Sequence, residues 1–180
     1  VFTGARLDEI SQALLTDFIE QDGVHCLRVY TSEDTKTKTT SSERLIPLHP
    51  FLVEDLKIMD RVERLKNRGE ERFFHTFSKS KDGYGRTLGR WFNDYLKPID
   101  VYIKYKKTFH SFRHTFTTNL YHNGIREADS RFLDGHSQDG VTFDTYLKAG
   151  KMSRLHEVLV NHLDYGIDLS HLKNSKYVVK

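Results

Sequence analysis

Residues 110–146 read HSFRHTFTTNLYHNGIREADSRFLDGHSQDGVTFDTY, and the interpretation of the whole chain depends on this stretch. Around its first part, apolar residues recur at helical intervals and predict a helix, namely Phe109, Phe112, Phe116 and Leu120. His110 and Arg113 are three positions apart, so their side chains project on neighbouring faces of that helix. Both side chains can therefore bind the same anion.

Two further polar side chains come later in the same stretch. Gly124 interrupts the helical pattern, and residues 126–133 are then predicted to form a short helix that ends at Gly135. His136 follows directly, and Tyr146 comes after a polar turn that contains glycine. By itself, this spacing predicts a group of side chains suited to handling a phosphate, with a phenol nearby.

The segments HSFRH, LDGHS and TFDTY, in this order and at these distances, resemble the active-site region of the tyrosine recombinases, the integrase family of phages and mobile elements. The resemblance implies that His110, Arg113 and His136 are catalytic and that Tyr146 is the nucleophile. Asp134 stands where leucine is common in the family, so we expect it beside His136, where it can alter the protonation of that imidazole.

The first residues of the chain resemble the first arginine motif of the same family. The motif is T-G-x-R-x-x-E, here Thr3, Gly4, Arg6 and Glu9, and it stands at the start of a helix predicted from Ile10, Leu14 and Phe18. In the family, an earlier helix and a separate DNA-clamping domain precede this motif. We therefore expect residues 1–180 to be a single catalytic-domain fragment that lacks both.

A polar loop between two predicted strands contains the candidate catalytic lysine. Residues 25–30 and 44–48 have strand-like composition, and the second segment resembles the R-x-x-P-L end of the family's lysine-bearing hairpin. Alignment on this end places Lys38 at the catalytic position, with Lys36 as a competitor. The alternative, in which both are ordinary solvated loop lysines, stays open.

The distribution of charge favours an anionic substrate. The formal net charge is only +3, but residues 101–180 hold 12 of the 28 basic side chains, 8 of the 25 acidic side chains and seven of the ten histidines. Cys26 is the only cysteine, which excludes an internal disulfide and a cysteine-based metal cage. No apolar run is long enough for a membrane span, and no secretory signal opens the chain, so we expect an intracellular protein without a membrane partner.

Three other helices are predicted, over residues 51–69, 86–96 and 152–163. Basic side chains around the second of them, together with Lys36, are candidates for DNA contacts, namely Lys79, Lys81, Arg86 and Arg90. Each is as readily an ordinary solvated charge. Residues 151–180 either pack on a neighbouring protomer, as a C-terminal segment often does in the family, or cover their own domain.

The resemblance implies a site-specific DNA recombinase that integrates or excises a mobile element in a bacterial or phage-infected cytoplasm. Tyr146 would attack a DNA phosphodiester and form a 3′-phosphotyrosine link, while Arg6 and Arg113 clamp the phosphate and Lys38 acts as general acid. The covalent link conserves the energy of the broken bond, so no ATP is expected, and the resemblance implies that no metal or cofactor is needed. The partners implied are double-stranded DNA and, in the full-length protein, further copies that form a tetramer on it.

Other functions compete with this interpretation. A relaxing topoisomerase or a telomere-type resolvase would use the same fold and chemistry. A DNA-binding module would catalyse no reaction, and its basic residues would only hold the DNA. A metal-dependent phosphoesterase built on His110 and His114 is disfavoured, because no third ligand follows at a motif distance. The expected fold is mainly helical with a small antiparallel sheet, an α+β domain like the catalytic domain of tyrosine recombinases.

Overall fold

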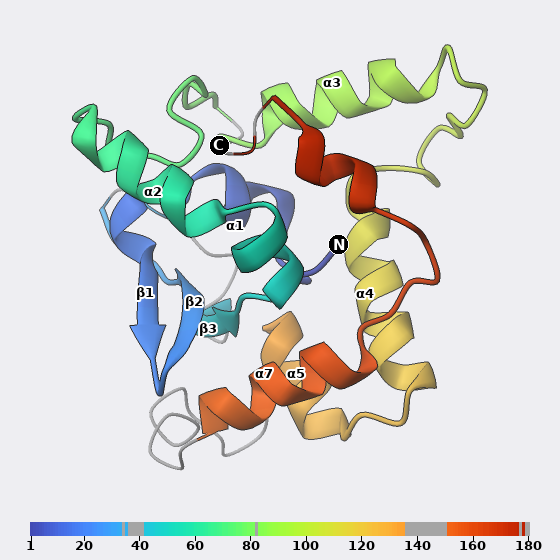
Figure 1. The fold of residues 1–180 in the computed structure, drawn as a ribbon. Coiled ribbons are helices and arrows are strands. Elements are labelled where there is room, and N and C mark those ends of the chain that lie inside the picture. Colours follow the sequence, from blue (N-terminus) through green and yellow to red (C-terminus); the bar gives the residue numbers. More distant parts are fainter. Residues whose placement is uncertain (34, 36–41, 82, 136–150, 177, 179–180) are drawn as a thin grey trace.

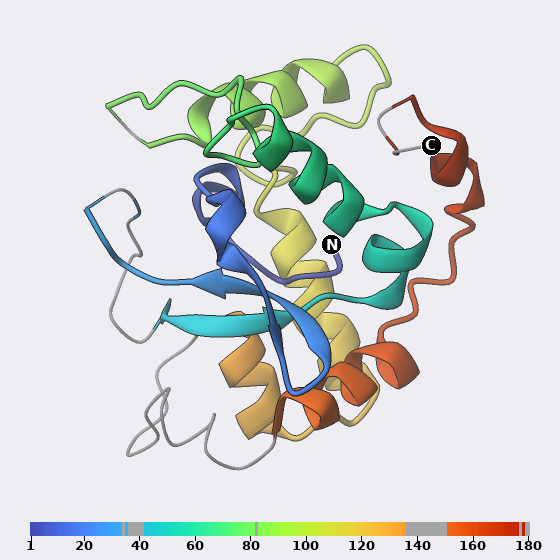
Figure 2. The same cartoon turned by 60° about the vertical axis from the view of Figure 1, so that its left-hand side comes forward.

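A three-stranded antiparallel sheet lies at one side of the molecule, with helices above and below it (Figures 1 and 2). The computed structural model describes residues 1–33, 35, 42–81, 83–135, 151–176 and 178. The strands follow each other in the order β1 (Phe18–Gln21), β2 (Val24–Val29) and β3 (Arg44–Pro47). Strands β2 and β3 confirm the two predicted strands.

Strand β1 was not predicted, because the sequence pattern favoured a helix that continued to Phe18. That prediction is wrong. Helix α1 (Leu7–Ser11) is short, and a 3-10 turn, η1 (Leu15–Asp17), leads into β1. The backbone between them pairs with a distant segment, since the Leu15 N–H donates to the Glu71 carbonyl at 2.8 Å and the Phe73 N–H to the Ala13 carbonyl at 3.1 Å. These tertiary hydrogen bonds outweigh the helical periodicity.

The helix predicted over residues 51–69 is divided in two, which corrects the expectation of one continuous helix. A π-helical turn, η3 (Phe51–Asp55), comes first, and α2 (Ile58–Asn67) follows. Between them Lys57 has a φ of 50°, a left-handed conformation that breaks the helical hydrogen-bond ladder. The apolar spacing continues across this residue, so periodicity alone could not reveal the break.

The other helices agree with the sequence prediction. They are α3 (Arg86–Leu96), α4 (Ser111–His122), α5 (Glu127–Asp134) and α7 (Lys151–His162). A short 3-10 helix that was not predicted, η4 (Ser170–Asn174), follows them. Helix α5 ends, as predicted, at Gly135, whose φ is +63°. Figure 1 shows α5 and α7 below the sheet, α4 beside them, and α2 and α3 above. The expected fold class, mainly helical with a small antiparallel sheet, is confirmed.

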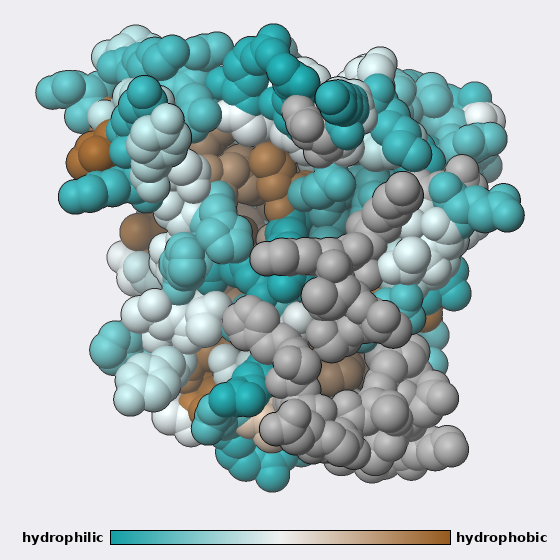
Figure 3. Space-filling view, turned by 180° about the vertical axis from the view of Figure 1, so that it is seen from behind, coloured by the Kyte–Doolittle hydropathy of each residue, from teal (hydrophilic) through white to brown (hydrophobic). Residues whose placement is uncertain are grey.

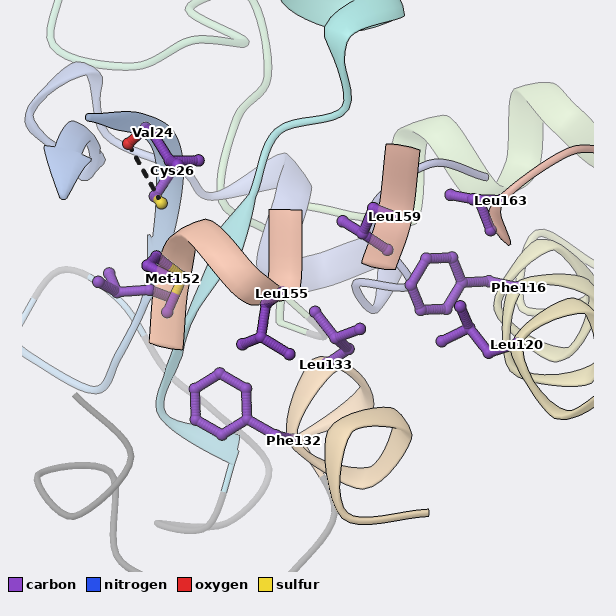
Figure 4. Packing of buried hydrophobic residues seen from close by; sticks show 11 residues of the cluster. Val24, Cys26, Phe116, Leu120, Phe132, Leu133, Met152, Leu155, Leu159 and Leu163 are labelled. Carbon is purple, nitrogen blue, oxygen red and sulfur yellow. Dashed lines mark hydrogen bonds between the residues drawn. The ribbon is translucent and has the colours of Figure 1, made fainter. Parts of the chain in front are cut away.

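Two buried clusters occupy the two faces of the sheet, because successive side chains of a strand point to opposite faces. On one face, Cys26 and Leu45 pack against helices α4, α5 and α7 (Figure 4). On the other, Leu27 and Ile46 pack against α2 and the residues that precede β1. The helices that carry the predicted site are thus fixed to the sheet by the first cluster.

Figure 3 shows the face opposite the one seen in Figure 1. This face is mostly hydrophilic and surrounds a recess in which hydrophobic residues are visible. Within the described ranges, no helix is both long enough and apolar enough to cross a membrane.

Candidate active site

Arg113 is buried between three elements. It lies on α4, where Phe116 and Leu120 fix the same helix in the core, and its exposed fraction is 6%. Its Nη1 donates to the Gly4 carbonyl at 2.6 Å across 109 positions of sequence, and its Nη2 donates to the Asp134 carbonyl. The guanidinium therefore joins the arginine motif at the start of the chain to the end of α5.

Arg6 lies at the start of α1, where Glu9 holds it in place. Glu9 Oε2 accepts the Arg6 backbone N–H at 2.8 Å, and Glu9 Oε1 accepts Arg6 Nη1 at 2.7 Å. Arg6 Nη1 also lies 3.0 Å from the Ser42 hydroxyl. The Arg6 side chain donates to described residues only through Nη1. Its Nε and Nη2 therefore make no hydrogen bond to these partners.

A third arginine, Arg44, supports the other two from inside the sheet. It is 1% exposed on β3, and its Nη2 donates to Glu9 Oε2 at 2.9 Å while its Nε donates to the Leu133 carbonyl at 2.9 Å. Its Nη1 donates to the Ser42 carbonyl at 2.7 Å. Arg44 thus connects the Glu9 that holds Arg6 with the end of α5.

The charges of this cluster affect one another. Burial lowers the pKa of Arg113 below that of a free guanidinium, and the positive charges of Arg6 and Arg44 lower it further, against the opposing effects of Asp134 and Glu9. For Glu9, burial raises the pKa, but the charge and hydrogen bonds of Arg44 and the hydrogen bonds from Arg6 outweigh it, so the pKa is lowered. The charges of Arg6 and Arg113 are therefore coupled within one cluster.

His110 lies one helical turn before Arg113, and its carbonyl accepts the Arg113 backbone N–H at 3.0 Å. Its imidazole is exposed and packs edge-on against the ring of His114, with ring centroids 4.8 Å apart. The structure thus places His110 at the surface directly beside the buried Arg113.

The remaining predicted residues fall into two sets. Four candidates for DNA contacts are exposed at or near α3, namely Lys79, Lys81, Arg86 and Arg90. Four others lie outside the described residues, namely Lys36, Lys38, His136 and Tyr146.

Sequence reasoning assigned no role to Arg44 and expected Asp134 to act on His136. An arginine in a strand of otherwise apolar residues was the signal that could have identified Arg44, because such a charge requires a buried partner. Asp134 is fully buried, and its carboxylate is directed toward Arg113, with Oδ1 4.0 Å from Arg113 Nη2. The described part of the chain places this carboxylate among the arginines.

No described group of three or more histidine, cysteine, aspartate or glutamate side chains is placed to hold a metal ion. Cys26 is buried in β2, and burial, with a smaller effect of Asp22, raises the pKa of its thiol to about 12. A thiol with this pKa is a poor nucleophile or ligand at neutral pH.

Comparison with protein families gives a match that covers most of the chain. The model of the phage integrase family matches residues 1–152. The chain belongs to the phage integrase family. The match confirms the resemblance inferred from the motifs of Arg6 and Arg113.

Two solved structures are similar to this integrase-family chain, and both are of the Tn1549 transposon integrase, one in complex with transposon right end DNA and one with circular intermediate DNA. Their sequences are 22% and 23% identical over 85% of this chain, with TM-scores of 0.48 and 0.47. The chain spans just over half of their length, 55% and 56%. Comparison with curated proteins found no match.

Proposed function

We propose that this chain is the catalytic part of a site-specific DNA recombinase that cleaves and rejoins strands to integrate or excise a mobile element. The observation that carries the proposal is the joining of the two arginine motifs. Arg113 donates to the carbonyl of Gly4, which belongs to the motif of Arg6, although 109 positions separate them. Family membership over residues 1–152 supports the same function.

The arginine cluster suits the chemistry of a phosphodiester. The phosphate repels nucleophiles, and its transition state concentrates further charge on the nonbridging oxygens, so preorganised donors lower the barrier most. A guanidinium is permanently charged and can donate to two oxygens at once. Arg6 and Arg113, supported by Glu9 and Arg44, act as this clamp, with His110 and His136 as additional donors.

The covalent step is assigned to Tyr146. Its phenol oxygen attacks phosphorus, the bond to the 5′ oxygen breaks, and the DNA 3′ end remains attached as a phosphotyrosine. Since a free phenol has a pKa of about 10, the cationic surroundings must favour the phenolate or a base must accept its proton. Lys38, with Lys36 as its competitor, gives a proton to the leaving oxygen.

The proposal extends to partners and organisation. Double-stranded DNA is the substrate, contacted also by the basic residues around α3, and the full-length protein acts as a tetramer on it in the cytoplasm of a bacterial or phage-infected cell. Residues 1–180 form one catalytic unit, to which a DNA-clamping domain is added in the full-length protein. Leu155 and Leu159 of α7 are fully buried in the first cluster, which supports packing of this part of the C-terminal segment on its own domain.

The test is a trapping assay with full-length protein. Nicked duplexes made from the source genome lose the short fragment next to the cleaved bond, so the covalent intermediate cannot be religated and appears as a protein–DNA band on a denaturing gel. We expect the band with wild-type protein and no band with Tyr146→Phe. The matched control is Tyr121→Phe, which also removes one tyrosine hydroxyl. Tyr121 is 79% exposed on α4 and is not one of the proposed site residues.

The other outcomes are informative as well. DNA binding without any covalent band would reject the recombinase in favour of a binding module, and a band that persists in Tyr146→Phe would remove Tyr146 from its role. Substrates with two sites then separate strand exchange from relaxation of one duplex.

A further inference from the structure

Asp134 occupies an unusual position for an acidic side chain. It is the last residue of α5, where the partial negative charge of the helix end disfavours a carboxylate, and it is only 1% exposed. A buried carboxylate without compensation costs several kcal/mol. Its surroundings must therefore supply compensating interactions.

The compensation comes from α4. The Thr117 hydroxyl donates to Asp134 Oδ2 at 2.7 Å, and Asp134 Oδ1 lies 4.0 Å from Arg113 Nη2. The same Arg113 nitrogen donates to the Asp134 backbone carbonyl. Asp134 thus binds the guanidinium through its backbone and faces it with its carboxylate.

The position of Asp134 also limits how Arg113 can move. A Cβ atom added to Gly4 would lie 3.2 Å from Asp134 Oδ1, and the Gly4 carbonyl accepts the other terminal nitrogen of Arg113. The carboxylate therefore fills the space beside Arg113 on the side of α5. Rotation of the guanidinium would require both carbonyl hydrogen bonds to break.

The cluster has a simple balance of charge. Three guanidinium groups, those of Arg6, Arg44 and Arg113, face two carboxylates, those of Glu9 and Asp134. Among these five described side chains, one positive charge remains. A phosphodiester carries one negative charge, so it would neutralise the group.

We propose that Asp134 is a positioning residue for the integrase reaction: an internal counter-ion that fixes the orientation of Arg113 and limits the cluster to the charge of a single phosphodiester. The inference rests on the proposed function, in which Arg113 binds the scissile phosphate. Asp134 itself does not touch the DNA. It acts through Arg113.

Two substitutions separate charge from packing. Asp134→Asn removes the charge, while the amide keeps the shape and can still accept the Thr117 hydroxyl. Thr117→Val removes that hydrogen bond and leaves the charge in place. A defect of packing alone should therefore appear in both variants, whereas a defect of charge should appear only in Asp134→Asn.

The measurement is thermal unfolding in sodium chloride and in sodium sulfate of equal ionic strength, with sulfate as the phosphate-like probe. In chloride, Asp134→Asn should lower the Tm by roughly 6 °C or more, because Arg113 loses its buried counter-ion. Sulfate should then raise its Tm by at least about 3 °C more than that of the wild type or Thr117→Val, since it can replace the missing charge. Equal responses of all three proteins to sulfate would overturn the inference.

The salt dependence of DNA affinity is a second readout, and a packing defect alone would not make it steeper. With one more uncompensated positive charge, Asp134→Asn should steepen the dependence of log affinity on log salt by about 0.9, while Thr117→Val leaves it unchanged. If wild-type protein forms the covalent DNA complex but sulfate does not distinguish the variants, the inference fails and the proposed function stands. If sulfate distinguishes them and no covalent complex forms, the proposed function fails alone.

Should Asp134→Asn not fold, the double variant with Arg113→Gln decides. In this double variant the side chains at positions 113 and 134 are both neutral. Neither leaves an uncompensated buried charge, so folding should recover. Because Arg113→Gln also removes the hydrogen bonds to the Gly4 and Asp134 carbonyls, the reference is Arg113→Gln alone, and a double variant no more stable than that single variant would overturn the inference.

Discussion

Glu9 accepts hydrogen bonds from two arginines while it is almost completely excluded from water. Replacement by glutamine removes the charge that Arg6 and Arg44 share and leaves the buried Arg44 uncompensated. We expect Glu9→Gln to lower the free energy of unfolding at neutral pH by about 3–5 kcal/mol. Urea denaturation followed by circular dichroism measures this change.

The pH dependence of the same variant has a defined sign. The folded pKa of Glu9 lies below its usual 4.5, so its contribution to stability is present above pH 4.5 and is lost as the pH falls through the lower folded value. The stability difference between wild type and Glu9→Gln should therefore shrink in that acidic range. Glu20→Gln, at an exposed position of β1, is the control, and an equally large effect there would contradict the explanation.

Glycine is required at position 4 by the backbone conformation there and by the close approach of the Phe116 ring. Its φ is +58°, and an added Cβ would lie 2.5 Å from two ring carbons of the buried Phe116. Gly4→Ala should cost about 1–2 kcal/mol for the left-handed backbone and a further 1–3 kcal/mol for overpacking. Thermal unfolding compares it with Gly124→Ala, where φ is +70° and nothing lies within 4 Å, so only the first cost applies. Equal losses in both variants would show that the contact with Phe116 is unimportant.

At the residue scale, the family resemblance pointed to Arg6, Glu9 and Arg113, but not to the contacts that hold Arg44 and Arg113. Arg6 and Arg113 could be predicted because short motifs in the sequence contain them. The link between Arg44 and Glu9 depends on how β3 lies against α1, and the contact of Asp134 with Arg113 depends on how α5 meets α4. Such contacts are decided by tertiary packing, which local sequence does not record.

At the scale of elements, one ion pair connects α5 to α7. Asp129 is 1% exposed on α5, and both of its carboxylate oxygens accept from Arg154 on α7, at 2.5 and 2.7 Å. Arg154→Met should lower the free energy of unfolding by about 3–5 kcal/mol, because it removes from a buried carboxylate the guanidinium that contacts both of its oxygens, and the pair with the exposed Arg126 compensates less. Chemical denaturation monitored by circular dichroism gives the value.

Arg131→Met is the matched control for this ion pair. Arg131 pairs with Glu127 at 2.6 Å on the same helix, but both side chains are exposed. Its loss should cost less than about 1 kcal/mol. If the two substitutions cost the same, burial is not what gives the Asp129 pair its strength.

The element that sequence reasoning missed had a local signal. Asp22 and Gly23 both have positive φ and connect β1 to β2 as a two-residue hairpin turn, with Gln21 opposite Val24. Asp-Gly between two strand-like segments is a strong hairpin pattern. The apolar spacing of Ile10, Leu14 and Phe18 concealed it. The break at Lys57 had no comparable signal, because a single left-handed residue leaves the periodicity on either side intact.

For the whole molecule, the sheet is shared by the two buried clusters, so neither cluster can open without disturbing the other. Cys26 belongs to the first cluster and Leu65, on α2, to the second. Cys26 is fully buried, and burial raises the pKa of its thiol to about 12, so a thiol reagent labels it only when the structure opens. The labelling rate therefore reports opening of the first cluster.

This arrangement predicts that a substitution that destabilises the second cluster raises the labelling rate of Cys26. Leu65→Ala should cost about 2–5 kcal/mol. When reclosing is faster than labelling, a loss of 2 kcal/mol should raise the labelling rate of Cys26 by a factor of about 30. Val160→Ala, at a position 43% exposed on α7, should leave the rate nearly unchanged. If Leu65→Ala lowered the midpoint of the circular-dichroism transition while Cys26 labelling stayed at the wild-type rate, the two clusters would unfold independently, and the arginine cluster between α1, β3 and α4 would then depend on the first cluster alone.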